Sequence, residues 1–303
     1  MSLEAEEAVA ADMMMCCASC GKAEVDDVKL KKCGCDLVKY CNINCQKNHR
    51  PQHKRVCKKL LAELRDKSLF TMPDESHEGD CPICCLPLPI NVRSTFMSCC
   101  SKRICNGCNY TNQIREEKEG LYPKCAFCRE PMPKSLEEGN KRIMKRIKEN
   151  NDPAAMAQMG HMRKGEGDYK IAFDYLTKAA ELGDAGAHYG LSWMYWKGGG
   201  VEKDKKKAIY HTEEAAIGGH PVARHNLGCE ERSNGRFERA RKHFIIAANL
   251  GFEESLKWLR TLYANGHASK EDYADALCAY QAAVDATKSA DREKAEAFLR
   301  NNS

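Results

Sequence analysis

Cysteine is concentrated in the first 128 residues of this 303-residue chain. Seventeen of the nineteen cysteines lie between Cys16 and Cys128, and only Cys229 and Cys278 lie beyond them. The N-terminus has neither the basic start nor the apolar stretch of a secretory signal, so we expect a reducing compartment, cytoplasmic or nuclear. Clustered cysteines in such a compartment are typical of metal sites rather than disulfides. A chain of this length also predicts more than one domain.

The first cysteine series, in residues 17–57, supplies eight metal ligands in four closely spaced pairs. Such pairs allow one tight turn to offer two ligands, and a second pair completes each tetrahedral site from a distance. A segment of about 40 residues cannot bury enough apolar surface alone, so metal must supply the missing stability. All four positions of each site come from protein, which predicts two structural zinc ions. The predicted ligands are Cys17, Cys20, Cys33, Cys35, Cys41, Cys45, His53 and Cys57.

The end of this series, KKCGCDLVKYCNINCQKNHRPQHKRVC, resembles the MYND zinc finger, whose hallmark is a YC-x3-CQ segment followed by a HK-x2-C ending. The resemblance implies a surface that binds short proline-containing peptides. Two features depart from the family pattern: the second pair is CxC rather than CxxC, and Arg50 stands where the family usually has tryptophan. The resemblance also implies interleaved ligand sets, namely Cys17, Cys20, Cys41 and Cys45 for one zinc ion, and Cys33, Cys35, His53 and Cys57 for the other.

A second cysteine series lies in residues 80–133, after a helix and linker predicted over residues 58–79. Its CPIC opening, its CAFCREP ending and the order of its pairs resemble a RING finger. A redox role for these CxxC pairs does not fit, because no βαβ unit precedes them. The resemblance implies one zinc ion on Cys81, Cys84, Cys105 and Cys108, and another on Cys99, Cys100, Cys125 and Cys128. The two series together therefore predict four zinc ions.

The middle of the second series is its least regular part. Lys102 stands where most RING fingers have a histidine ligand, and a lysine ammonium cannot bind zinc. The adjacent Cys99 and Cys100 would complete the site in an all-cysteine variant. Cys85 and His77 are the alternative ligands.

RING fingers commonly recruit a ubiquitin-conjugating enzyme through an apolar residue inside the first pair and an arginine just after the last cysteine. Ile83 and Arg129 occupy those two positions, whereas Ala126 replaces the proline often found in the last pair. The resemblance therefore implies partner-binding roles for Ile83 and Arg129. The alternative is that Ile83 only packs inside its zinc turn and that Arg129 is a solvated charge.

The chain becomes alanine-rich and periodic over residues 152–288. Four segments begin at Asp152, Asp184, His220 and Phe252, with spacings of 32, 36 and 32 residues. Each predicts two helices joined by a turn, and the endings KAAELG, EAAIGG and IAANLG align directly. Repetition with this period predicts a solenoid of helical hairpins. The second segment is similar to a Sel-1-like repeat, a relative of the tetratricopeptide family, which implies a concave surface for another protein.

The remaining segments complete the expected organisation. Residues 134–151 predict a basic linker helix in which Ile143 and Ile147, four residues apart, dock on the first repeat. Residues 1–16 and 289–303 are expected to be tails. The predicted fold class is thus small cross-braced zinc modules, MYND-like and RING-like, joined to an all-α solenoid.

The net charge and the lack of catalytic motifs narrow the function. Fifteen cysteine thiolates would subtract fifteen charges and four zinc ions would add eight, which takes the formal charge from +5 to −2 and argues against a nucleic-acid partner. No apolar run approaches the roughly 18 residues of a membrane span. No acid/base pair or Ser-His-Asp arrangement stands out. The sequence favours a zinc-binding scaffold for other proteins or short peptides, and the alternative is a RING-type ubiquitin ligase whose repeats recruit substrate.

Overall fold

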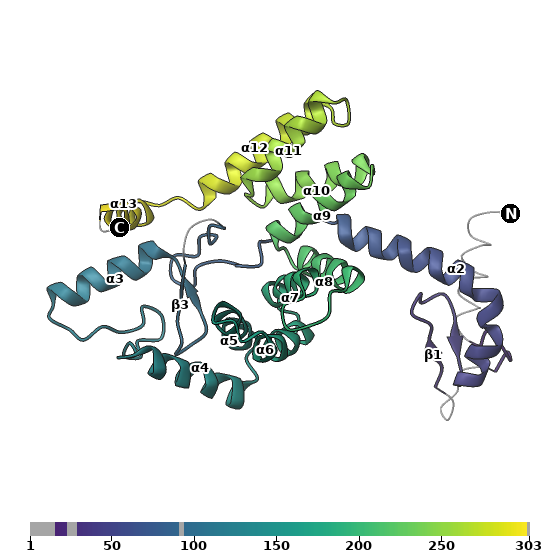
Figure 1. The fold of residues 1–303 in the computed structure, drawn as a ribbon, viewed down its shortest axis with the longest axis horizontal. Helices are drawn as coiled ribbons and strands as arrows, with labels where there is room; N and C mark the ends of the chain where they lie inside the picture. Colours follow the sequence, from purple (N-terminus) through teal and green to yellow (C-terminus); the bar gives the residue numbers. More distant parts are fainter. Residues whose placement is uncertain (1–15, 23–28, 91–93, 302–303) are drawn as a thin grey trace. The chain divides into compact units, whose positions relative to one another are not determined.

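The computed structural model describes residues 16–22, 29–90 and 94–301. The chain divides into two units, residues 1–69 and 70–303 (Figure 1). The first unit contains strands β1 (Lys31–Lys32) and β2 (Lys39–Tyr40) and nearly all of helix α2 (Ile43–Phe70). The two strands pair antiparallel, with Lys31 opposite Tyr40. Among the described residues of this unit, a small apolar cluster beside the strands consists of Cys17, Leu30, Val38 and Tyr40.

The second unit begins with the second cysteine series, residues 80–133, here called the second module. Strands β3 (Thr95–Phe96) and β4 (Arg103–Ile104) form an antiparallel hairpin, and helix α3 (Asn106–Lys118) follows at once. Cys105 caps α3, because its sulfur accepts a hydrogen bond from the Cys108 backbone N–H. The core combines Leu88, Met97 and Ile104 with ligand cysteines. This core is too small to hold the module together by apolar burial alone.

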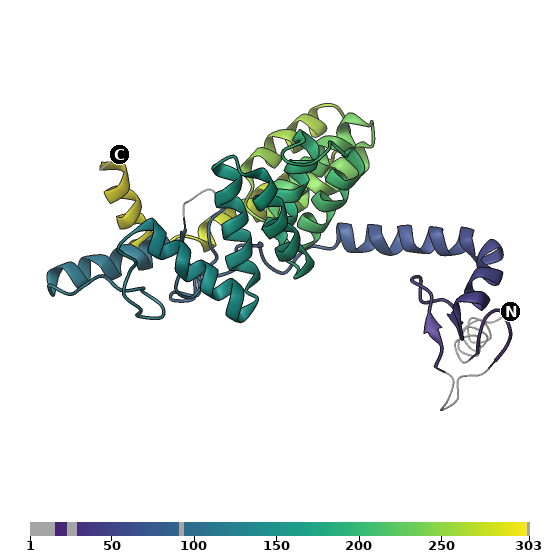
Figure 2. The same ribbon diagram turned by 60° about the horizontal axis from the view of Figure 1, so that its bottom comes forward.

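Eight helices form the solenoid and pack as successive pairs (Figures 1 and 2). The first helices of the first three pairs are capped by Asp152, Asp184 and His220, whose side chains accept hydrogen bonds from backbone N–H groups three residues later. Phe252 opens the fourth pair without a side-chain cap. The four predicted segment starts are therefore helix N-caps. The pairs are α5 (Pro153–Gly165) with α6 (Tyr169–Glu181), α7 (Ala185–Lys197) with α8 (Lys205–Ile217), α9 (Pro221–Ser233) with α10 (Phe237–Asn249), and α11 (Glu253–Ala264) with α12 (Lys270–Ala286).

Small residues allow the paired helices to approach closely. Ala179, Ala215 and Ala247, at equivalent places in three repeats, are fully buried. Gly228 lies so close to the ring of Phe244 that a Cβ there would be 2.6 Å from a ring carbon. Phe244 is itself fully buried, so the ring fills the space that the glycine leaves. Packing complementarity of this kind is what stabilises a solenoid.

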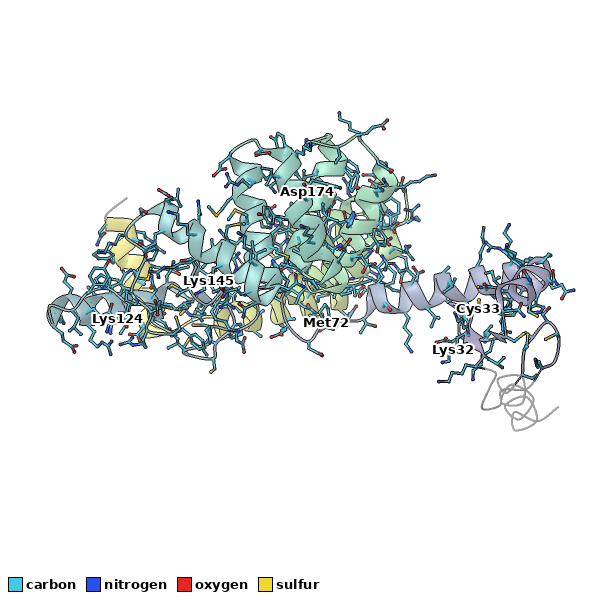
Figure 3. The ribbon with its side chains drawn as sticks, turned by 90° about the horizontal axis from the view of Figure 1, so that it is seen from below. Lys32, Cys33, Met72, Lys124, Lys145 and Asp174 are labelled. Carbon is cyan, nitrogen blue, oxygen red and sulfur yellow. The ribbon has the colours of Figure 1, made fainter. Side chains whose placement is uncertain are left out.

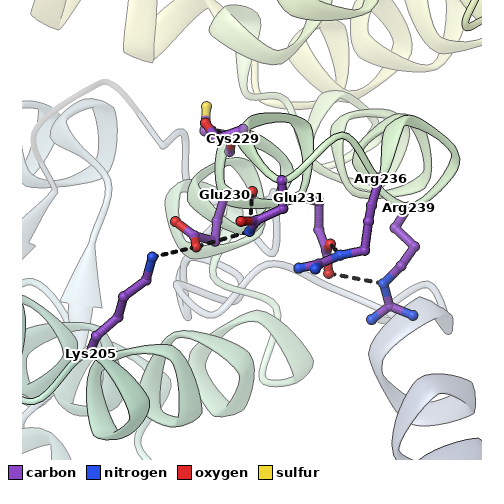
Figure 4. Close-up of polar contacts among 8 residues, drawn as sticks. Lys205, Cys229, Glu230, Glu231, Arg236 and Arg239 are labelled. Carbon is purple, nitrogen blue, oxygen red and sulfur yellow. Dashed lines mark hydrogen bonds and ion pairs between the residues drawn. The ribbon is translucent and has the colours of Figure 1, made fainter.

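Ion pairs join successive helices of the solenoid (Figure 4). Lys205 at the start of α8 lies 2.8 Å from a carboxylate oxygen of Glu230 on α9. The neighbouring Glu231 is buried and pairs with both Arg236 and Arg239. A buried carboxylate is costly unless it is paired, so these two guanidinium groups compensate the charge of Glu231.

Helix α4 (Leu136–Asn150) connects the second module to the first repeat. Ile143 is buried against Ala155 and Met159 of α5, which confirms the docking face predicted from the isoleucine spacing. On the same helix, the Arg146 guanidinium donates to the Ser101 hydroxyl at 2.7 Å and pairs with Asp152 at 2.7 Å. The linker helix is thus packed on both of its neighbours.

The C-terminal residues differ from the expected tail. They form helix α13 (Ala290–Asn301), which packs against α3 of the second module (Figures 1 and 2). Arg292 and Ala295 are buried, although most of the helix surface is polar. Sequence periodicity could not reveal this docking, because the partner of α13 lies in a distant part of the chain.

Candidate metal centres

Four groups of side chains bring their sulfur and imidazole nitrogen atoms together. Within each group the ligand atoms all lie within 4.8 Å of one another. Figure 3 shows Cys33 in the first cysteine-rich module, residues 17–57, and Lys124 just before the last pair of the second module. The groups are Cys17, Cys20, Cys41 and Cys45; Cys33, Cys35, His53 and Cys57; Cys81, Cys84, Cys105 and Cys108; and Cys99, Cys100, Cys125 and Cys128. Both modules therefore interleave their pairs in the cross-braced order.

Three of the CxxC pairs lie on backbone turns of the same type. In the turns that begin at Cys17, Cys81 and Cys125, the fifth residue donates its N–H to the first residue's carbonyl at 2.8 to 3.0 Å. The fifth residue has a left-handed backbone in each, with φ of 69°, 54° and 64° at Gly21, Cys85 and Arg129. Left-handed non-glycine residues cost on the order of 1 kcal/mol, which the rest of the site must offset. This turn offers the first and fourth side chains to one metal ion.

The CxC pair of the first module uses a shorter form of the same turn. The Asp36 N–H donates to the Cys33 carbonyl at 2.9 Å, and Asp36 has φ of 57°. The turn of this CxC pair is therefore one residue shorter than that of a CxxC pair. Its left-handed residue is the fourth residue of the turn rather than the fifth. This departure from the family pattern leaves Cys33 and Cys35 within one ligand group.

The adjacent Cys99 and Cys100 belong to a turn that begins two residues earlier. The Ser101 N–H donates to the Met97 carbonyl at 2.8 Å, and Ser101 has φ of 56°. The buried Met97 takes the place of a first cysteine, so the ligand atoms come from the third and fourth positions. The Cys99 sulfur lies 3.3 Å from that of Cys128.

The alternative ligands considered for this site lie elsewhere. The Lys102 backbone carbonyl accepts a hydrogen bond from Met97, and Lys102 supplies no atom to the ligand group. Cys85 is exposed at the end of its own turn. The His77 ring stacks on His220 of the solenoid, with ring centroids 4.0 Å apart.

Helix α2 carries three ligands of the first module. His53 and Cys57 are four residues apart and so share one helix face. The His53 Nε2 atom lies 3.1 Å from the Cys35 sulfur. Near it, His49 stacks on the His53 ring, at 5.6 Å between centroids, and shares a hydrogen bond of 2.9 Å with the Tyr40 hydroxyl. These contacts fix the orientation of the ligand helix against β2.

The thiols of one group oppose one another's ionisation. Burial raises the pKa of Cys17, but hydrogen bonds from backbone N–H groups outweigh it and lower that pKa to about 6. The hydrogen bond with Cys45, with burial, raises the pKa of Cys41 in the same group to about 12. Four sulfur atoms this close cannot all be thiolates unless a cation lies between them. A divalent, thiolate-binding ion such as zinc fits that requirement, since binding releases the thiol protons.

Comparison with family models identifies the first module. Residues 17–57 match the model of the MYND finger. This segment is a MYND finger. Its eight Cys and His side chains, with their paired spacing and ligand geometry, make it a zinc-binding module.

The solenoid matches a second family model. Residues 153–184, 185–220 and 221–252 each match the Sel1 repeat. Each match spans one helix pair, from α5 to α10. The fourth pair, α11 with α12, lies beyond these matches, and none of them covers the second module, residues 80–133. The RING-type interpretation of the second module therefore stays a prediction.

Two solved structures are similar to this chain. A Sel1 repeat protein from Oxalobacter formigenes is 23% identical, with a TM-score of 0.44, over 57% of this chain and 51% of that one. The protein c5321, a protective antigen of uropathogenic Escherichia coli strains with an SLR fold, is 20% identical, with a TM-score of 0.40, over 65% and 40%. The present chain thus spans about half or less of the length of these proteins.

The residues predicted to bind a partner lie on two equivalent turns of the second module. Ile83, the third residue of its turn, has 41% of its surface exposed. Phe127 holds the same position in the turn of Cys125 and is 43% exposed. Sequence reasoning missed Phe127, although its matching place in a CxxC pair was a signal for it. Arg129 donates to the Asn112 side chain on α3 at 2.7 Å, which holds its guanidinium beside the helix.

The MYND finger and Sel1 repeats are protein-interaction modules, and the described part of the solenoid contains a cavity. A cavity of about 350 Å³ lies between α7, α8 and α9, with Trp193, Trp196 and Leu227 among its walls. Trp196 has 49% of its surface exposed. A hydrogen bond of 2.6 Å joins the hydroxyls of Ser192 and Thr212, two further lining residues.

Each described helix is too short or too polar to span a bilayer.

Proposed function

We propose that this chain is a protein-interaction scaffold whose first two modules, residues 17–57 and 80–133, hold four structural zinc ions. One observation supports it most directly: four ligand groups, each of four side chains, have their ligand atoms within 4.8 Å. Four protein ligands fill a tetrahedral zinc site and leave no position for water or substrate. The metal therefore stabilises binding surfaces rather than performing chemistry.

Native mass spectrometry tests this proposal, with four zinc ions expected per chain. Cys84→Ala should lose one ion, because Cys84 belongs to a ligand group. Cys85→Ala is the matched control, since the Cys85 thiol is next to Cys84 in the chain but is exposed and belongs to none of the four ligand groups. Two or fewer ions in the wild-type chain would contradict the double cross-brace. Three ions would indicate that the group of Cys99 and Cys100 does not bind zinc.

The partners of the scaffold are proteins or short peptides, and the repeats over residues 152–288 offer the main surface. The cavity walled by Trp193 and Trp196 suits an apolar side chain of an extended peptide. Peptides selected for binding to the wild-type chain should lose affinity for Trp196→Ala. Tyr263→Ala, which removes an exposed aromatic residue from α11, is the control. Equal binding to both variants would place the peptide site elsewhere.

The cysteine content suits a cytoplasmic or nuclear location. The structure pairs none of the nineteen cysteines in a disulfide. Seventeen of them lie in or beside the two zinc modules, fifteen as proposed ligands and two, Cys16 and Cys85, outside the ligand groups. Thiolate zinc sites persist where thiols stay reduced. Fluorescence microscopy of the tagged chain would test this, and secretion into an oxidising compartment would contradict it.

A RING-type ubiquitin ligase is the second candidate function. The exposed side chains of Ile83 and Phe127 at matching positions of two turns favour it, because exposed apolar side chains suit contact with a conjugating enzyme. Arg129 follows the last cysteine, where the RING resemblance implies a residue that hydrogen-bonds across both partners. Such ligases form no covalent intermediate and act by positioning the bound thioester for attack. The repeats would then recruit the substrate.

Autoubiquitination with a panel of conjugating enzymes tests this second function. Ile83→Ala and Arg129→Ala should abolish transfer while four zinc ions are retained. Leu136→Ala, which removes another exposed apolar side chain from the same unit, is the control. If the wild-type chain transfers no ubiquitin with any enzyme of the panel, the ligase function is excluded and the scaffold function remains. Transfer unchanged by both substitutions would show that the RING analogy assigns the wrong surface.

A further inference from the structure

An arginine of the C-terminal helix enters the second module beside one of its ligand groups. The Arg292 side chain donates to the backbone carbonyls of Leu86 and Pro87 at 3.1 and 2.7 Å, and to the Cys84 sulfur at 3.4 Å. It also donates to the Thr287 carbonyl at 2.7 Å, just before α13. The residue is only 6% exposed. A buried guanidinium of this kind is stabilised by acceptors on several sides.

The backbone of the second module is shaped for this helix. A Cβ on Gly107, which lies between two ligand cysteines, would be 2.7 Å from the Arg292 backbone nitrogen. Such contact with backbone atoms cannot be relieved by a rotamer change, so the glycine allows α13 to approach the start of α3. Further along the helix, the Phe298 ring packs on Tyr110 of α3, with centroids 5.0 Å apart. Docking therefore involves both ends of α13.

The charge of the neighbouring metal group explains why arginine suits this place. Four thiolates on one zinc ion leave a net charge of −2, and hydrogen bonds from an outer cation reduce the cost of holding that charge. The planar guanidinium presents several donors in a fixed fork, which allows one side chain to reach a sulfur and carbonyls together. A lysine supplies the charge but not the fork.

We propose that Arg292 is an outer-sphere positioning residue for the zinc site of Cys81, Cys84, Cys105 and Cys108, so that zinc retention there depends on the docking of α13. The proposal rests on the zinc ligand set proposed above. Helix α13 then belongs functionally to the second module, whereas the sequence predicted a tail over residues 289–303. Outer-shell substitutions typically weaken metal binding by about 10- to 100-fold.

Zinc release from the full chain to a chromogenic chelator tests the coupling. A Cys84→Ala chain first identifies which kinetic phase belongs to this site, because that phase should vanish. Arg292→Met should accelerate the same phase by about tenfold, and Arg292→Lys should restore part of the retention. Arg300→Met is the matched control on α13, since Arg300 is exposed and pairs only with the half-buried Glu296 among the described contacts. It should release zinc at the wild-type rate.

Two further readouts separate charge from folding. Phe298→Ala weakens helix docking without touching the turn, so it should also accelerate that phase. In cobalt-loaded protein, Arg292→Met should shift the thiolate-to-cobalt absorption to longer wavelength, because a sulfur that loses a hydrogen bond donates more readily. Unchanged release and unchanged absorption in Arg292→Met would overturn the proposal. A Cys84→Ala chain that keeps as much zinc as the wild-type chain would instead refute the ligand set.

Discussion

The second module and the solenoid occupy one structural unit but are built on opposite principles. The second module surrounds two ligand groups with a core of only a few apolar side chains, such as Met97 and Ile104. The solenoid has fully buried side chains in every repeat, among them Leu176, Leu191 and Phe244. In the second module the proposed zinc ions would supply the cross-links that a larger apolar core would otherwise replace. In the solenoid, neighbouring helices supply the apolar burial. The second module and the solenoid are therefore each stabilised by interactions of their own, although the two parts are in contact through α4 and α13.

Removal of zinc should separate the two regions most strongly. A chelator should unfold residues 17–57 and 80–133, because structural zinc contributes on the order of 10 kcal/mol in such modules. Hydrogen exchange would report that loss by segment. All three tryptophans, Trp193, Trp196 and Trp258, lie in the solenoid, so their fluorescence should stay close to that of the zinc-loaded chain. Chelator-resistant cysteine modules would refute the comparison.

A cavity in the solenoid core should act in the reverse direction. Phe244→Ala should lower the free energy of unfolding of the solenoid by about 3 to 5 kcal/mol, because the ring is fully buried against Gly228. Urea unfolding followed by tryptophan fluorescence measures it, and native mass spectrometry should still find four zinc ions. Leu277→Ala, at a half-exposed position of α12, should cost far less. Loss of zinc from Phe244→Ala would show that the regions are not independent.

Acid should weaken the solenoid through a buried histidine. Burial, with the nearby charges of Arg224 and Arg239, lowers the pKa of His243 to about 3. The histidine in the unfolded chain has a pKa of about 6.5, so below that pH the unfolded chain binds a proton that the folded chain does not. Stability from this residue is complete above the unfolded pKa and falls by about 1.4 kcal/mol per pH unit as the pH drops from there. His243→Leu should flatten that slope between pH 6.5 and 5, measured by urea unfolding with tryptophan fluorescence. An unchanged slope would contradict the burial argument.

Loss of one helix cap should have the smallest effect. The Asp204 carboxylate accepts hydrogen bonds from the Lys206 and Lys207 backbone N–H groups at 2.9 and 3.0 Å. Asp204→Ala should destabilise the solenoid by about 1 kcal/mol, as loss of such a cap usually does. Asp174→Ala, at an exposed position within α6, is the matched control (Figure 3). A control as costly as Asp204→Ala would show that charge rather than capping is being measured.

Much of the fold could be read from local pattern. The repeat starts at Asp152, Asp184 and His220 are helix N-caps, because a capping side chain and a period of about 34 residues are both written in the sequence. The first three repeats also match a family model. The isoleucine spacing in residues 134–151 likewise predicted the docked face of α4, since helical periodicity places such residues together.

The ligand pattern was only partly readable. Spacing alone shows paired cysteines, but it does not show which pairs meet, and the RING and MYND resemblances supplied that expectation. The place of Cys99 and Cys100 depends on a turn that begins at Met97, so counting from later cysteines pointed to Lys102 instead. A backbone hydrogen bond, rather than a motif, decides which side chains face the metal.

The sequence by itself determined the elements of this protein: the cysteine pairs, the repeat period and the helix caps all depend on residues close together in the chain. Only the tertiary structure decided how those elements meet, including the interleaving of the pairs and the docking of α13 on α3. Arg292 resembles a surface charge in the sequence of its own helix, and it becomes a buried donor because Gly107 allows α13 to approach and the turn at Cys84 and Leu86 supplies acceptors. Local pattern encodes conformation, whereas contacts between distant segments are selected by the packing and charge of both partners.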